Sequence, residues 1–201
     1  MNHHKSFFSR ARLSIAAVGL ALLISQPGQA DPARPGHYVI DAGHTSVHFS
    51  ISHLGYSDLK GRFNKVEGEF DLNPQGKSKL EIRIPTASID TNHEKRDHHL
   101  RSPDFFNARQ FPRITFTSTD VSYNDQGEPI SIKGTLKLHG KSRPLTLKVT
   151  AKRAAKDPWG NYRAGFAASA TLKRSDFGMN YMPGGIGDEV KLDIDMEALR
   201  Q

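Results

Sequence analysis

The sequence contains no cysteine, and this absence excludes several kinds of site. Disulfide bonds, thiolate metal centres and cysteine nucleophiles all need a thiol, which none of the 201 residues supplies. The Gly-x-Ser-x-Gly turn of many hydrolases and the Gly-x-x-x-x-Gly-Lys loop of many nucleotide-binding proteins are also absent from the sequence. The sequence therefore offers little catalytic chemistry, and we expect no catalytic residue and no metal site.

A long run of one charge is absent as well. The formal net charge is +7, but Lys5, Arg10 and Arg12 account for three of these charges, and no acidic residue lies before residue 31. A nucleic-acid-binding protein is expected to gather its basic residues on one face, and the remaining sequence shows no such run. We therefore expect a surface of mixed charge and no nucleic-acid partner.

The longest apolar run lies near the N-terminus and predicts a secretory signal peptide in residues 1–30. Its 12 residues, 13–24, follow the three basic residues, and Gly28-Gln29-Ala30 offers the small side chains that a signal peptidase requires. A membrane span needs about 20 apolar residues, so an uncleaved membrane anchor is the weaker alternative. We expect cleavage after Ala30, which leaves residues 31–201 as one mature domain without a membrane span.

The rest of the sequence is dominated by an alternation of polar and apolar side chains. In residues 65–72, each odd-numbered residue is charged and each even-numbered residue is apolar or glycine. Alternation with period two is typical of a β-strand that has one face in water and the other on a core. The pattern recurs, with turn residues between the segments, in residues 46–53, 79–84, 114–123, 130–138, 145–151, 166–172 and 190–197.

These segments predict an all-β domain of about eight antiparallel strands. Either a closed up-and-down barrel or a two-sheet sandwich can be built from them. A barrel has no exposed strand edges, and the first and last segments alternate as regularly as the central ones, so the barrel is favoured. Residues 88–111 break the alternation, and Ser102-Pro103-Asp104 is a favourable helix start. We expect one or two short helices there, capping an open end of the barrel.

The inward face of the predicted barrel leaves its interior open to two interpretations. An eight-stranded barrel is wide enough either to be filled by its own side chains or to hold one small ligand. Small inward residues could leave room for a ligand in an apolar pocket lined with aromatic rings, or they could lie opposite large residues in a solid core. The large inward residues are Phe49, Phe63, Phe70, Phe116 and Phe166, and the small ones are Gly68, Gly134, Ala168 and Ala170.

Few polar residues stand out as binding or catalytic candidates. The histidine-rich segment that begins at His93 has His-Glu-x-x-x-His-His spacing, whereas a zinc-protease helix needs His-Glu-x-x-His to place two imidazoles on one metal. His53 lies at an inward position, either as a core histidine or as a polar contact for a ligand. The glycine-rich loop after Phe177 holds Met179 and Met182, and it either packs on its own barrel or covers a pocket as a lid.

Several short segments, in their order and spacing, resemble the YceI family of bacterial periplasmic proteins. The opening segment, residues 38–49, resembles the first strand of the family, and Arg96-Asp97 with Asp104-Phe105-Phe106 resembles its most specific segment. The resemblance extends over residues 37–199. Further matching segments are residues 53–55, 61–63, 99–102, 111–119, 134–140, 174–178 and 186–190.

This resemblance implies a lipocalin-like β-barrel in the periplasm, with a long apolar tunnel that holds a polyisoprenoid or a similar long-chain lipid. The hypothesis is a binding or carrier protein rather than an enzyme, with no cofactor apart from such a lipid. Two alternatives stay open. One is an enzyme that acts on the lipid with Asp97 and His99 as acid and base, and the other is a stress-response protein without a specific ligand. The family also allows a homodimer.

The expected ligand contacts fall into three groups, which combine the inward pattern with the resemblance. Aromatic and aliphatic inward residues would hold the lipid tail, polar residues near the mouth would hold the head group, and the loop after residue 176 would cover the opening. The tail residues are Phe49, Ile51, Phe63, Phe70, Phe116 and Phe166, the head-group residues are His53, His99 and Arg174, and the lid residues are Phe177 and Met179.

Overall fold

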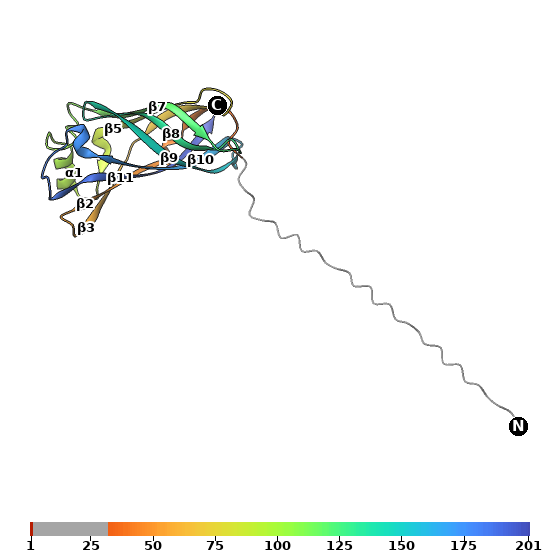
Figure 1. Ribbon diagram of the computed structural model, residues 1–201, viewed down its shortest axis with the longest axis horizontal. Helices are drawn as coiled ribbons and strands as arrows, with labels where there is room; N and C mark the ends of the chain where they lie inside the picture. The colour runs from red at the N-terminus through yellow and green to blue at the C-terminus, as the bar shows by residue number, and fades with distance from the viewer. Residues whose placement is uncertain (2–31) are drawn as a thin grey trace.

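The computed structural model describes Met1 and residues 32–201. The rest of the expected signal peptide and its cleavage site after Ala30 lie outside the described residues, so both stay predictions. Residues 32–201 form an elongated barrel whose strands run obliquely along its long axis (Figure 1). The helix α1 (Glu94–Leu100) lies at one end, called here the α1 end, and the C-terminus lies at the other, called the C-terminal end.

Five consecutive strands build most of the barrel wall. Each of the first four pairs antiparallel with the next strand along the chain, which is the order that short turns produce. These strands are β7 (Arg113–Tyr123), β8 (Pro129–Leu138), β9 (Lys141–Lys156), β10 (Tyr162–Lys173) and β11 (Ile186–Arg200).

The other three positions in the wall are each occupied by two shorter strands that lie in line. β1 pairs with the end of β11, with Tyr38 opposite Arg200, and β2 pairs with the earlier part of β11, with Ser46 opposite Asp195. Because β1 also pairs with β4, the sheet closes on itself, which confirms the expected eight-stranded antiparallel barrel. The pairs in line are β1 (Gly36–Ile40) with β2 (Ser46–His53), β3 (Ser57–Phe63) with β4 (Glu67–Leu72), and β5 (Lys79–Pro85) with β6 (Ile89–Asp90).

Burial along the strands follows the alternation in the sequence. In β4, for example, Phe70 and Leu72 are buried, whereas the charged residues Glu67, Glu69 and Asp71, which alternate with the inward positions, are exposed. The alternation in residues 130–138 predicts that Ile130 faces inward together with Ile132 and Gly134, but Ile130 is 44% exposed. The ladder between β7 and β8 shifts its register between Ser122 and Tyr123, and a shift of one residue turns a side chain to the other face of the sheet.

Two inward glycines lie beneath aromatic rings on neighbouring strands. A Cβ atom added to Gly61 in β3 would overlap the ring of Phe49, and one added to Gly134 in β8 would overlap the ring of Phe116. These glycines therefore do not create empty space by themselves. They let a phenylalanine ring lie against the barrel wall.

The helix forms earlier in the chain than expected. His93 is the N-cap of α1, and its side chain accepts a hydrogen bond from the Arg96 N–H. The expected start at Ser102 was wrong, because the chain there forms turns and the left-handed conformation of Asn107 (φ 45°) would end a helix that began at Ser102. In the part of the chain that the structure describes, no helix combines the length and the apolar character that a bilayer crossing requires.

Candidate functional site

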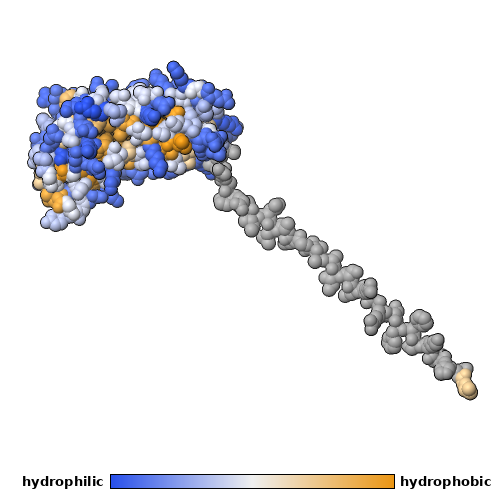
Figure 2. Space-filling view, in the orientation of Figure 1, coloured by the Kyte–Doolittle hydropathy of each residue, from blue (hydrophilic) through white to orange (hydrophobic). Residues whose placement is uncertain are grey.

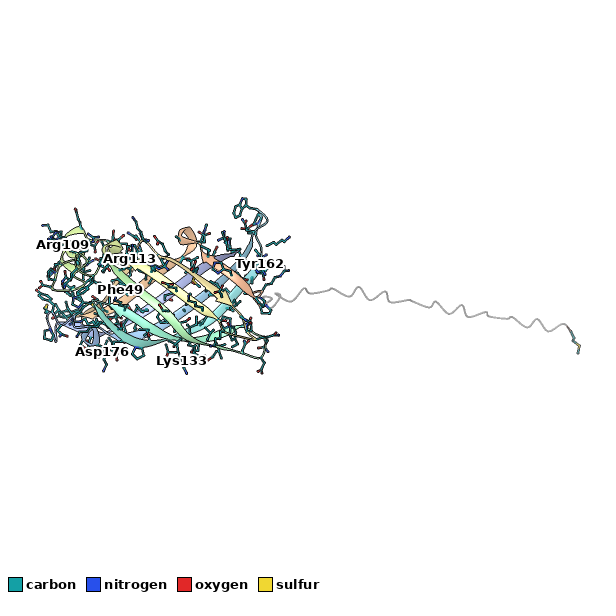
Figure 3. The ribbon with its side chains drawn as sticks, turned by 90° about the horizontal axis from the view of Figure 1, so that it is seen from above. Phe49, Arg109, Arg113, Lys133, Tyr162 and Asp176 are labelled. Carbon is teal, nitrogen blue, oxygen red and sulfur yellow. The ribbon has the colours of Figure 1, made fainter. Side chains whose placement is uncertain are left out.

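An apolar cavity of about 630 Å³ occupies the interior of the barrel at its α1 end. This volume lies within the roughly 300–1,000 Å³ that is typical of small-ligand sites. Phe49, labelled in Figure 3, lines the cavity together with residues from most of the wall strands. The interior is therefore hollow at this end, and the pocket interpretation of the inward pattern holds over the solid core.

A second cavity of about 60 Å³ lies further towards the C-terminal end. Ile82, Leu147 and Ile194 line both cavities and so mark the boundary between them. Beyond this boundary the interior is filled by aromatic rings. Phe70 stacks on Tyr38 with 4.9 Å between the ring centroids and meets Phe166 edge-on at 5.8 Å. Of these two apolar cavities, only the one at the α1 end is thus large enough for a ligand.

The structure divides the six expected tail residues between the two cavities. Phe49, Ile51, Phe63 and Phe116 line the large cavity. Phe70 and Phe166 line the small cavity instead, so a tail would reach them only beyond the boundary. Contact between any of these residues and a ligand stays a prediction.

The large cavity reaches the surface between two loops at the α1 end. Several residues both line the cavity and are exposed, among them His53 and Lys60 near the β2–β3 turn and Tyr181 and Met182 on the loop before β11. The Leu54 N–H donates to the Gly185 carbonyl oxygen at 2.7 Å and joins the two loops. His53 is consequently not a core histidine. It lies at the mouth, where a head group would be.

Arg174 is buried, and its guanidinium holds the loop that borders the mouth. Its Nε, Nη1 and Nη2 atoms donate to the carbonyl oxygens of Gly187 (2.8 Å), Met179 (2.6 Å) and Ile186 (3.0 Å). These bonds tie both ends of the segment 179–187 to one side chain. Arg174 lines the cavity, but its main contacts are with this loop, so it is first of all a positioning residue.

Asp188 fastens the same loop from the outside. It accepts hydrogen bonds from the Ser175 N–H at 2.9 Å and from the Ser175 hydroxyl at 2.8 Å. Desolvation by burial acts to raise the pKa of the Asp188 carboxyl, but the two bonds from Ser175 and the charges of Arg174 and Lys173 outweigh it and lower the pKa. Asp188 is thus held in its charged form at neutral pH.

The two expected lid residues lie in different places. Met179 is only 5% exposed and lines the large cavity. Phe177 is 2% exposed and ends the 3-10 helix Arg174–Phe177, where its carbonyl oxygen accepts a hydrogen bond from His139 Nδ1 at 2.9 Å. Because Phe177 packs in the core and is not among the residues that line the large cavity, it does not belong to a lid.

His99 and Asp97, the suggested acid–base pair, are bonded to different partners. His99 Nε2 lies 2.8 Å from Asp104 Oδ2, and its ring contacts the rings of Phe105 and Tyr181 at the mouth. Asp97 is buried and accepts hydrogen bonds from the Thr91 N–H at 2.8 Å and the Thr91 hydroxyl at 2.5 Å. Asp97 therefore fastens α1 to the end of β6, and His99 borders the cavity.

A separate polar cluster lies next to β1 and the end of β11. The ligating atoms of Asp41, His44 and Glu197 lie within 4.8 Å of one another, as in a metal site. Arg163 Nη1, however, donates to Asp41 Oδ2 at 2.5 Å and to Glu197 Oε2 at 2.7 Å. The hydrogen bond from Arg163 is the largest cause that lowers the pKa of Asp41 to about 2. The cluster is an ion-pair network that joins β10, β11 and the end of β1.

Sequence reasoning missed most of the cavity wall, because it concentrated on phenylalanine. Aliphatic side chains form the larger part of the lining, and the same period-two pattern marks them as inward. Phe105 and Phe106 lie in the irregular segment after α1, where no period predicts direction. The main missed residues are Ile84, Phe105, Phe106, Ile114, Leu136, Leu138, Leu145, Leu147, Leu172, Val190 and Leu192, whereas Tyr181 and Met182 belong to the loop expected as a lid.

The family model and the similar sequences all point to one family, that of the YceI-like domain. The model of the YceI-like domain matches residues 38–198. A UPF0312 protein of Vibrio cholerae serotype O1 is 40% identical over 192 residues, which cover 94% of this chain and 98% of that protein. A UPF0312 protein of Pseudomonas paraeruginosa is 43% identical with the same coverage.

Solved structures agree with the fold. The YCEI protein of Campylobacter jejuni is 31% identical with a TM-score of 0.66, covering 75% of this chain and 90% of that one. A structure described as a polyisoprenoid binding domain from Saccharophagus degradans is 16% identical with a TM-score of 0.64, covering 84% of this chain and 100% of that one. At 16% identity, the likeness to the Saccharophagus degradans domain shows the fold alone.

Proposed function

Since the chain belongs to the YceI-like domain family, we propose that it binds an amphipathic, long-chain lipid of the isoprenoid type and carries it through the periplasm. The observation that carries this proposal is the apolar cavity of about 630 Å³, which reaches the surface at the α1 end. The description of the Saccharophagus degradans relative as a polyisoprenoid binding domain supports the ligand class.

The energy of tail burial accounts for binding without any catalytic group. Each buried CH₂ group contributes about 0.8 kcal/mol, so a dozen of them contribute roughly 10 kcal/mol before the cost of association, which is about 4–15 kcal/mol. A short tail therefore binds weakly, whereas a tail long enough to fill the large cavity binds well. The 60 Å³ cavity alone is too small for such a tail.

The polar residues at the mouth are suited to an anionic head group. Lys60 and His53 are both exposed and both line the opening, so an ammonium group and an imidazole meet a ligand whose tail lies inside. A phosphate would accept charge-assisted hydrogen bonds from both. The loop 179–187, held by Arg174, would border the tail where it enters.

Native mass spectrometry of the protein purified from the periplasm, with organic extraction of bound material, tests this function. We expect one tail-bearing lipid per chain. The variant Leu136→Trp places a large ring in the cavity and should lose the lipid, whereas Thr135→Trp, an exposed position on the same strand, should keep it. A wild-type protein that carries no lipid and also rejects long-chain prenols would contradict the proposal, and a lipid that is altered on incubation would favour an enzyme.

A further inference from the structure

Large apolar side chains are exposed on the two loops at the mouth of the cavity. Leu54 is 46% exposed and Tyr56 is 89% exposed on the β2–β3 turn, and Tyr181 and Met182 are 41% and 45% exposed on the loop before β11. We call these four residues the rim patch. The β2–β3 turn projects from the α1 end in Figure 1, and Figure 2 shows some apolar surface at this corner as well as along the middle of the barrel.

The backbone at the rim patch holds two of these side chains in an unfavourable conformation. Leu54 and Met182 have positive φ angles of 52° and 50°, a region that residues other than glycine, asparagine and aspartate rarely adopt. Gly55 and Gly184, beside them, also have positive φ. Positive φ at both Leu54 and Gly55 fits a tight hairpin turn, in which the Tyr56 N–H donates to the His53 carbonyl oxygen at 3.1 Å, so the turn holds Leu54 and Tyr56 in fixed positions at the rim.

The rim patch is continuous with the wall of the large cavity. Tyr181 and Met182 line the cavity and are also exposed. A tail that leaves a bilayer for the cavity passes this surface, and exposing the tail to water costs free energy for every methylene group. Contact between the rim patch and a bilayer would give the tail an apolar path. The C-terminus lies at the other end of the barrel and leaves this end accessible (Figure 1).

We propose that the rim patch docks on the surface of a lipid bilayer and inserts Tyr56, Tyr181 and the two aliphatic side chains at the level of the head groups. Tyrosine is enriched at such interfaces because its ring is apolar and its hydroxyl is polar. Next to the two rim loops, Asp58 and Lys60 lie in β3, Lys173 ends β10 and Asp176 lies in the 3-10 helix Arg174–Phe177, so the charges of these four residues balance. Docking is therefore driven by apolar insertion rather than by attraction to anionic lipids. The role of docking, which is to give the lipid tail an apolar path into the cavity, rests on the proposed function. Docking itself needs no bound ligand.

Sedimentation with vesicles of phosphatidylethanolamine and phosphatidylglycerol, without isoprenoid, tests the proposal. The double variant Tyr56→Ser/Met182→Ser should lower vesicle binding by about tenfold or more. The matched control is Trp159→Ser, which removes an exposed aromatic residue (79% exposed) on the β9–β10 turn, away from the rim. The control and about 1 M salt, which screens surface charge, should each change binding by less than about twofold.

A fluorescent variant tests the orientation directly. In the background Trp159→Phe, the variant Tyr56→Trp carries its single tryptophan on the rim patch. Its emission should shift to the blue on vesicles and be quenched by brominated acyl chains. Because an unfolded chain could also place its tryptophan in the bilayer, the circular dichroism of the variant must match that of the wild type, and a tryptophan that is neither shifted nor quenched would contradict the docking orientation.

Three outcomes would overturn the docking proposal. Loss of vesicle binding in high salt with the rim variant unaffected would indicate electrostatic binding by another face. An equal loss in Trp159→Ser would indicate non-specific adsorption. A dimer that Tyr56→Ser dissociates would indicate that a second copy covers the patch. Lipid retention, measured separately on the same proteins, distinguishes the two proposals, because retention without docking refutes only this one and docking without retention refutes the proposed function.

Discussion

The two ends of the barrel are built from the same alternating strands, but aromatic rings are arranged differently in them. At the α1 end, Phe49 and Phe116 lie against Gly61 and Gly134 on the barrel wall, and a cavity of about 630 Å³ stays open. At the C-terminal end, Phe70 packs on both Tyr38 and Phe166, and the cavity next to these rings inside the barrel is about 60 Å³. Phe49 also meets Phe63 at 5.9 Å between the ring centroids, so the ends differ in that only at the α1 end do two of the rings lie flat against glycines of the wall.

Polar contacts reinforce the difference between the ends. Tyr38 is fully buried, its hydroxyl donates to the Arg34 carbonyl oxygen at 2.6 Å, and burial raises its pKa to about 12. The network of Asp41, Arg163 and Glu197 fastens the strands near the same residue. At the mouth, by contrast, polar groups hold loops rather than strands. One end thus provides stability and the other provides space.

The largest expected effect is on stability, and it should come from the filled end. Phe70→Ala removes a ring that packs on two others, and substitutions of this kind cost about 3–5 kcal/mol. We expect the free energy of unfolding, measured by denaturant titration, to fall by this amount. Phe49→Ala at the hollow end should cost less, because its ring already borders empty space. Equal losses at the two sites would remove the distinction between the ends.

The next largest effect should be local to the mouth. Arg174→Ala leaves three carbonyl oxygens without their donor, which costs about 1–3 kcal/mol for a buried group. Amide hydrogen exchange should rise in the segment 179–187 and stay unchanged in β7 and β8. Arg174→Lys keeps the charge but lacks the fork that reaches three acceptors, so it should behave like the alanine variant. A uniform rise in exchange along the barrel would show that Arg174 supports the whole fold instead.

A smaller effect should follow when a ring is displaced from its glycine. In Gly61→Ala, the new methyl group overlaps the Phe49 ring and Thr91 Cγ2, both of which are side-chain atoms that can move. We expect the ring to turn into the cavity and lipid retention to fall by about threefold, which corresponds to less than 1 kcal/mol. Gly165→Ala meets no atom closer than 3.5 Å and should retain lipid as the wild type does. Unchanged retention in Gly61→Ala would mean that the ligand does not use this part of the cavity.

The smallest effect concerns pH and the C-terminal end. The pKa of Asp41 is lowered from 3.8 to about 2 in the folded protein, so its contribution to stability is present above the ordinary pKa and is lost as the pH falls from about 4 to 2. The difference in unfolding free energy between wild type and Asp41→Asn should therefore shrink over this range. A difference that stays constant down to pH 2 would show that the Asp41–Arg163 pair does not stabilise the fold.

The sequence was enough to predict the strands, because the period-two alternation in residues 65–72 and its repeats depends only on which face of a strand meets water. The barrel was favoured over a sandwich because it leaves no exposed strand edge. The sequence could not predict how the interior is divided, since the space above Gly134 depends on where the Phe116 ring lies. It also could not predict the role of Arg174, because the partners of its guanidinium are backbone carbonyls that every residue carries. Phe177 and Ser102 were misplaced for a related reason: both lie in irregular segments, where no period indicates direction.

The most direct test is a crystal structure of the protein with its co-purified lipid. The account predicts continuous density for one tail that enters between the β2–β3 turn and the loop 179–187, passes Phe49 and Phe116, and extends towards Ile82, Leu147 and Ile194. Its head group should lie near His53 and Lys60. A lipid bound on the outer surface, or a cavity that the protein's own side chains close when lipid is present, would contradict it.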